Sequence, residues 1–186
     1  MRTKLILVLG ILTICIICGI TTWYRWEFPY GQRPCALPCT IQGLWMYANQ
    51  HEGWFPSQTN SSNTLDLLRE LVPGYVAPGV LAGVSGNVSK VRQCLETGRA
   101  IDSSISSWVY WQGFRADDDP RLAIIWERAE GVNGIGQRSL SGGHAVGFAD
   151  GTYRQIAKTD WAAFVKSQEV LRAKVVSGRK ADLKKN

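Results

Sequence analysis

A long apolar run near the N-terminus constrains this chain more than any other feature. The run extends from Leu5 to Tyr24, and Arg25 ends it. About 20 such residues can cross a hydrocarbon layer of about 30 Å as an α-helix. Arg2 and Lys4 precede the run, and basic residues on that side favour a cytoplasmic N-terminus and an exported remainder. We therefore predict a membrane anchor over 1–26, with membrane lipid as one partner.

A cleaved signal peptide is the alternative to an anchor. The apolar stretch is longer than a usual signal-peptide core, and no small-x-small motif precedes a clear start of a mature chain. We therefore expect a single-pass protein of the inner membrane that keeps its native N-terminus. The bulk of the chain would then lie in the periplasm.

The positive charge of the chain is concentrated at its C-terminus. The chain has 21 basic and 15 acidic residues, which gives a formal net charge of +6. Most of this excess lies after Lys166, in a segment without interleaved aromatic residues. Such a segment is typical of a solubilising tail, so we expect no nucleic-acid partner. Residues 177–186 have no apolar face, which predicts a basic disordered tail.

Between the anchor and the tail the composition is that of one folded domain. Hydrophobic residues make up 45% of the chain and charged residues 19%, which excludes a disordered polymer. Prolines at 29, 34 and 38 predict an extended linker over 27–38. Apolar residues at helical spacing then predict a helix over 40–50, and Thr159 or Asp160 begins a last helix. We predict an α+β domain over 39–176.

Period-two patterns predict a small antiparallel sheet in the second half of the domain. Runs rich in β-branched and aromatic residues occupy 105–112 and 122–127. Asp150 and Gly151 separate two further runs and predict a hairpin with a two-residue type I′ turn. The arms of this hairpin would be 144–149 and 152–157. The expected inward side chains are Val146, Phe148, Tyr153 and Ile156.

The cysteines fit an exported domain with one disulfide. Cys15 and Cys18 lie inside the apolar run, and Cys35, Cys39 and Cys94 lie in the exported part. An odd number predicts one bridge and one free thiol in an oxidising compartment. Cys94 would pair with Cys35 or with Cys39, and no Cys or His pair with metal-ligand spacing completes a zinc site.

Two segments of the domain resemble a known family. The segment 39–56 contains the helix-ending pattern Y-A-x-x-x-x-G-x-F-P, and the segment 141–156 contains G-G-x-x-V-x-F-A-D-G. Together they resemble pilin-like proteins, the type II secretion pseudopilins and especially the pseudopilin-like proteins of planctomycetes. The matching residues are Tyr47, Ala48, Gly53, Phe55, Pro56, Gly142, Gly143, Val146, Phe148, Ala149, Asp150 and Gly151.

The resemblance implies a fold and a role. It implies a transmembrane helix followed by a pilin-like domain whose helices pack on a small antiparallel sheet. It also implies a structural or assembly component of a secretion or pilus-type apparatus, with other pilin-like or apparatus subunits as partners and no enzymatic activity. The family's cysteine lies some way before the helix, so Cys35 is the expected partner of Cys94.

The chain departs from this family at several positions. Gly10 is not followed by the F-T-L-x-E of a prepilin peptidase site, and the apolar run contains no glutamate. Leu140 stands where many relatives carry a histidine. Three prolines also interrupt the place where a long first helix would continue. Both N-terminal processing and filament assembly are therefore left open.

Three other groups of residues are candidate sites. Some major pseudopilins hold calcium in a loop of the β region, and here Asp117, Asp118 and Asp119 could supply oxygen ligands, although a solvated turn explains them as well. Exposed tryptophan rings could form a glycan- or polymer-binding surface, and the candidates are Trp54, Trp108 and Trp111. The third group could form the nucleophile, base and orienting carboxylate of a hydrolase, and it consists of Ser139, Ser141, His144 and Asp150. Apart from calcium, we expect no cofactor or metal.

Overall fold

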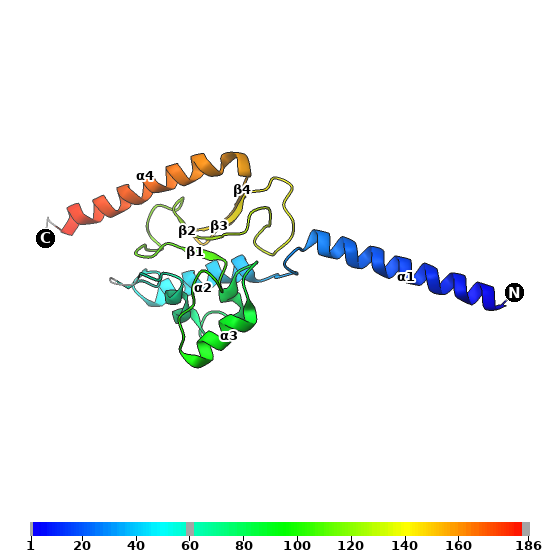
Figure 1. The fold of residues 1–186 in the computed structure, drawn as a ribbon. Coiled ribbons are helices and arrows are strands. Elements are labelled where there is room, and N and C mark those ends of the chain that lie inside the picture. Colours follow the sequence, from blue (N-terminus) through cyan, green and yellow to red (C-terminus); the bar gives the residue numbers. More distant parts are fainter. Residues whose placement is uncertain (1, 59–61, 184–186) are drawn as a thin grey trace.

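The computed structural model describes residues 2–58 and 62–183. It begins with α1, Arg2–Glu27, a single helix that projects away from the rest of the molecule (Figure 1). The stretch Leu9–Glu27 is long and apolar enough to span a membrane, and none of it is buried within the protein. The predicted anchor is therefore a helix whose apolar surface is free to contact lipid or another helix.

Four short strands form one antiparallel sheet in the order β1-β2-β3-β4, so that neighbours along the chain are neighbours in the sheet. The bounds are Trp108–Tyr110 for β1, Ala123–Glu127 for β2, His144–Phe148 for β3 and Tyr153–Ile156 for β4. The predicted α+β class is confirmed. The first two strands are shorter than the runs that predicted them.

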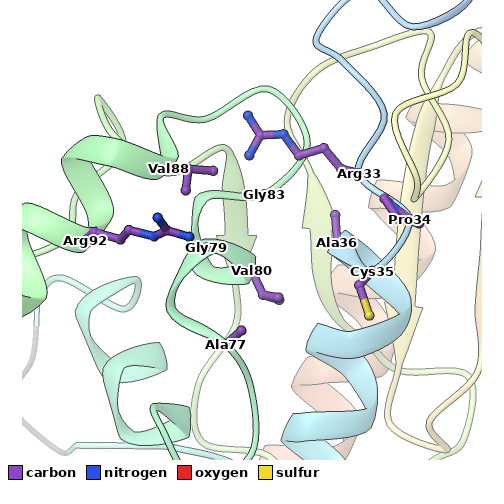
Figure 2. A pocket seen from close by; sticks show the side chains of 10 residues that line it. All are labelled: Arg33, Pro34, Cys35, Ala36, Ala77, Gly79, Val80, Gly83, Val88 and Arg92. Atoms are coloured by element: carbon purple, nitrogen blue, oxygen red, sulfur yellow. The ribbon is translucent and has the colours of Figure 1, made fainter.

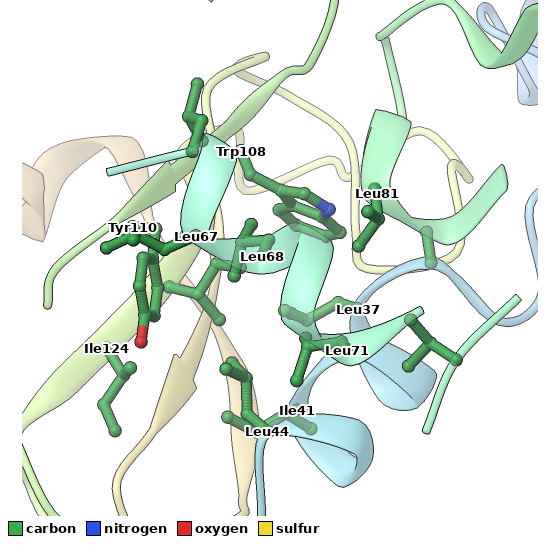
Figure 3. Close-up of a cluster of buried hydrophobic side chains, with 14 of the residues drawn as sticks. Leu37, Ile41, Leu44, Leu67, Leu68, Leu71, Leu81, Trp108, Tyr110 and Ile124 are labelled. Atoms are coloured by element: carbon green, nitrogen blue, oxygen red, sulfur yellow. The ribbon is translucent and has the colours of Figure 1, made fainter. Parts of the chain in front are cut away.

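Helices cover both faces of the sheet (Figure 1). On one face lie α2 (Ala36–Gln50), the 3-10 helices η1 (Asp66–Leu71) and η2 (Pro78–Ala82), and α3 (Val88–Thr97). Figure 3 shows leucines of α2, η1 and η2 around Trp108 and Tyr110 in the main core. The opposite face is covered by α4, Lys158–Leu183, where Trp161 and Phe164 pack against Val146 and Phe148.

The helix α2 begins at Ala36, earlier than the expected domain start at 39. Pro38 therefore lies in the first turn, where a helix has no use for the missing N–H group. Leu37, Ile41 and Leu44 are fully or almost fully buried and pack the helix on the sheet. The expected proline-rich linker, 27–38, is corrected to a shorter connection between α1 and α2.

The hairpin of β3 and β4 is confirmed, but its turn differs from the expected one. Phe148 N donates to Thr152 O at 2.9 Å, and Gly151 N donates to Phe148 O at 3.0 Å. These bonds enclose three loop residues rather than two. Gly151 has a φ of +81°, and Asp150 has no positive φ. The expected type I′ turn is therefore wrong, and the loop is a three-residue connection that ends in a left-handed glycine.

One of the four expected inward side chains of the hairpin points outward. Val146, Phe148 and Ile156 belong to the cluster beneath α4. Tyr153 is 52% exposed. Side chains alternate along a strand, so Tyr153 and Ile156, three residues apart, cannot share a face.

We expect Gly151→Val to destabilise the domain by about 1–3 kcal/mol, because valine resists a positive φ. A Cβ at this position would also lie 3.2 Å from Cδ1 of Trp45. The control is Asp150→Asn, because Asn keeps the Oδ1 atom that accepts from Thr152 N at 2.9 Å. Urea unfolding of the detergent-solubilised chain, followed by tryptophan fluorescence, measures both. Equal midpoints for the parent and Gly151→Val would contradict the turn geometry.

The predicted disordered tail is helical as far as the structure describes it. The helix α4 continues to Leu183, and residues 184–186 lie outside the described part. Arg179 donates to Gly113 O at 2.7 Å and pairs with Asp118. Arg172 lies over the ring of Trp111, 3.7 Å from its centroid. Arg179 therefore joins the segment that has no apolar face of its own to a distant loop.

Candidate functional site

The end of α1 is fixed to the folded domain by a set of contacts that we call the anchor clamp, formed by Trp26, Glu27, Gln137 and Arg138. Arg138 N donates to Glu27 O at 2.7 Å, and Arg138 Nε donates to Trp26 O at 2.9 Å. Gln137 Nε2 donates to Glu27 Oε1 at 2.6 Å. The guanidinium of Arg138 lies 5.1 Å from the centroid of the Trp26 ring. Backbone, side-chain and cation–π contacts thus join the two parts.

The segment that follows α1 is also bound to the domain. Arg33 N donates to Ile135 O at 2.9 Å, and Leu37 N donates to Gly134 O at 3.0 Å. The same loop of the domain therefore contacts the last turn of α1 and the first turn of α2. This arrangement fixes the direction in which α1 leaves the domain.

An exposed leucine lies beside the anchor clamp. Leu140 is 94% exposed and lies two residues after Arg138. It is the position at which many members of the resembled family carry a histidine. In the structure an apolar side chain therefore projects from the loop that holds the end of the apolar helix.

A pocket of about 240 Å³ lies where α2 begins (Figure 2). Apolar side chains of η2 and α3, Val80 and Val88, form part of its wall. Arg33 and Arg92 also line it, together with Cys35. Its described lining contains two guanidinium groups and no carboxylate, which suits an anionic ligand of small size.

The structure corrects the expected disulfide. Cys35 pairs with Cys39, and Cys94 is a buried free thiol in α3. The expected bridge from Cys94 to Cys35, or alternatively to Cys39, is not formed. The reason is the early start of α2, which places Cys35 and Cys39 one helical turn apart with a Cα–Cα distance of 5.0 Å.

Each of the three candidate calcium ligands forms an ion pair with an arginine. Asp117 pairs with Arg115 at 2.8 Å, and Asp118 pairs with Arg179. Asp119 pairs with Arg121 at 2.7 Å, and the hydrogen bonds from that side chain lower the pKa of Asp119 to about 2. Within the described residues, no group of three or more His, Cys, Asp and Glu side chains could hold a metal ion.

The three candidate tryptophans do not form an open surface. Trp108 is fully buried, and its Nε1 donates to Val80 O at 3.0 Å. The guanidinium of Arg179 lies 4.8 Å from the ring centroid of Trp54. Arg172 covers Trp111 as described above. The flat faces that a sugar ring would stack on are therefore buried or contacted by arginines.

The candidate hydrolase residues lie at opposite ends of one strand. His144 begins β3, and its Nδ1 lies 3.0 Å from Glu127 O. Asp150 lies in the loop after β3, where it bonds Thr152. Ser139 and Ser141 contact each other at 3.0 Å. The carboxylate therefore cannot orient the imidazole, and the set is no catalytic triad.

A buried carboxylate that sequence patterns did not single out organises the region between η2 and the sheet. Glu127 is fully buried at the end of β2. Its oxygens accept from Val84 N at 2.8 Å, Ala129 N at 3.0 Å and two serine hydroxyls. The serine donors are Ser85 at 2.9 Å and Ser107 at 2.7 Å. The one feature of the sequence that could have indicated this role is the acidic residue at the end of the strongly apolar strand A-I-I-W-E.

The two segments that carry the family resemblance pack against each other. Gly147 lies beneath α2, where an added Cβ would be 3.1 Å from Cδ1 of Ile41. Trp45, also in α2, contacts the turn at Gly151. Phe55 is buried in the main core, and the carbonyl of Pro56 accepts from the Tyr110 hydroxyl at 2.8 Å.

Comparison of the chain with models of protein families, with curated proteins and with solved structures gives no match.

Proposed function

We propose that the chain is a membrane-anchored, pseudopilin-like component that serves assembly in a secretion or pilus-type apparatus. The observation that carries this proposal is the packing of segment 39–56 on segment 141–156, the two segments that resemble the family. They are distant in sequence, yet α2 lies across the sheet at Gly147 and over the turn at Gly151. A helix packed across an antiparallel sheet, after an apolar N-terminal helix, is the arrangement that the resemblance implies.

The anchor clamp supports an assembly role. A subunit that packs against its neighbours through its membrane helix can hold its domain in a defined place only if the helix and the domain move together. The bonds from Gln137 and Arg138 to the last turn of α1 provide such a connection. The exposed side chain of Leu140 would then lie at the lipid interface, where apolar residues are favourable.

Purification of the tagged full-length chain from its native membranes tests the proposal. The expected result is co-purification of other proteins that have an apolar N-terminal helix, or of the export apparatus. An Ile16→Lys variant provides the control, because a charge on the exposed face of α1 should remove partners that pack through this helix. Recovery of the parent chain without any protein partner, or from the soluble fraction, would contradict the proposal.

We expect Arg138→Ala to loosen α1 from the domain without unfolding it, because it removes the side-chain hydrogen bond to Trp26 O and the cation–π contact with the Trp26 ring. The measurement is a distance distribution between spin labels at Thr22 and Val170, both exposed, in the detergent-solubilised chain. The distribution should broaden in Arg138→Ala. Arg154→Ala is the control, because Arg154 contacts Phe148 in the hairpin instead. Equal widths in the parent chain and in Arg138→Ala would show that the clamp does not hold α1.

A further inference from the structure

The Cys35–Cys39 disulfide adds little to the stability of the fold. It joins Cys35, the residue before α2, to Cys39 in the first turn of the helix, and their backbones are already hydrogen-bonded, Cys39 N to Cys35 O at 3.2 Å. A crosslink stabilises mainly by closing a long loop in the unfolded chain, and this loop is very short. Opening the disulfide should therefore leave the domain folded.

The disulfide is accessible from one side. Cys35 is exposed, whereas Cys39 is half-buried. Cys35 also lines the pocket at the start of α2, opposite the wall formed by η2 and α3 (Figure 2). A thiol that enters the pocket meets Cys35 first.

The charges around the pocket select the kind of thiol. Arg33 donates to the neutral carbonyl of Gly86 at 3.1 Å, and no carboxylate among residues 2–58 and 62–183 forms an ion pair with it. Arg92 also lines the pocket. The N-terminal end of α2 adds partial positive charge. Positive charge beside a disulfide attracts an attacking thiolate and stabilises the thiolate that leaves.

We propose that Cys35–Cys39 is a thiol–disulfide exchange site for a small anionic thiol bound in this pocket. The thiolate of the first thiol attacks Sγ of Cys35, the disulfide bond breaks, and Cys39 leaves as a thiolate. A second thiolate attacks the sulfur of the first thiol in the mixed disulfide, and Cys35 leaves as a thiolate. The two small thiols are oxidised to one disulfide, and the protein gains two electrons and, at neutral pH, two protons.

Reduction rates with thiols of different charge test this proposal on the full-length chain in detergent. Glutathione is the anionic probe and cysteamine the cationic one, and alkylation followed by peptide mass spectrometry counts the free thiols. Each rate is divided by the rate of the same reagent with a small disulfide that carries no charge, which removes the intrinsic reactivity of the reagent. The corrected rate should be several-fold higher for glutathione than for cysteamine.

Variants separate binding in the pocket from simple exposure. Arg92→Ala should lower the glutathione-to-cysteamine ratio several-fold, whereas Arg92→Lys should largely retain it. Arg154→Ala, in β4, should leave the ratio unchanged. In a Cys39→Ser variant, oxidised glutathione should form a mixed disulfide on Cys35.

Three results would each overturn the proposal. The first is a corrected rate for cysteamine equal to or above that for glutathione. The second is a glutathione preference that Arg92→Ala leaves unchanged. The third is a large fall in the unfolding midpoint of the chain when the disulfide is reduced, because that would assign the bridge a structural role.

Discussion

Glu127→Ala is expected to destabilise the domain by about 3–5 kcal/mol, because it leaves several hydrogen-bond donors in a buried site without an acceptor. The carboxylate is fully buried and accepts from the backbone N–H groups of Val84 and Ala129. Val84 is fully buried, so its N–H group cannot reach solvent water without a local rearrangement. The loss should separate the segment after η2 from the end of β2.

Equilibrium urea unfolding in detergent, followed by tryptophan fluorescence, measures this effect. Glu127→Gln should lie between the parent and Glu127→Ala, since the amide keeps one accepting oxygen. Glu130→Ala is the matched control, because Glu130 is a more exposed acid that pairs with Lys158 at 2.8 Å. Its unfolding midpoint should equal that of the parent. A Glu127→Ala variant with the parent midpoint would show that the hydrogen bonds to this carboxylate contribute nothing net.

Gly143→Ala is expected to cost a similar amount, about 3–5 kcal/mol, because strain and a backbone clash combine. Gly143 has a φ of +71°, and an added Cβ would lie 1.9 Å from Ile156 O. His144 pairs with Ile156 in the sheet, so the clash would separate β3 from β4 where the hairpin begins. The close approach of Ile156 O therefore explains why the second residue of the G-G pattern is a glycine.

The control for this prediction is Gly113→Ala. Gly113 has a φ of +82°, but nothing lies within 4 Å of an added Cβ. Its cost should therefore be the strain alone, about 1–2 kcal/mol. Thermal or urea unfolding of the two variants separates strain from clash. Equal losses for Gly113→Ala and Gly143→Ala would mean that Ile156 moves away freely.

Features set by neighbouring residues were predictable from the sequence. The apolar helix, α2 and the hairpin depend on periodicity and on turn residues within a short stretch of chain. The type of turn was not predictable, because a two-residue and a three-residue loop both place a glycine at a left-handed position. Asp150 and Gly151 therefore located the hairpin without fixing its loop length.

Features set by distant residues were not predictable. Arg179 fixes the end of α4 through Gly113 and Asp118, which lie far away in the sequence. Counting cysteines predicted a pair between Cys94 and either Cys35 or Cys39, and neither forms, because the observed pair depends on where α2 begins. Glu127 is important because donors from two other segments, residues 84–85 and Ser107, bond to its carboxylate. The periodicity of residues within one strand does not indicate such hydrogen bonds from distant segments.

The assembly role depends on what surrounds α1 in the membrane. Ile14 is 62% exposed on this helix and is a suitable position for a photoreactive amino acid. The direct measurement is photo-crosslinking from this position, and from Ile17 and Ile20 in separate experiments, in native membranes. We predict covalent adducts with another protein that has an apolar N-terminal helix, from at least one of these positions. Adducts with lipid alone from all three positions would contradict the assembly role.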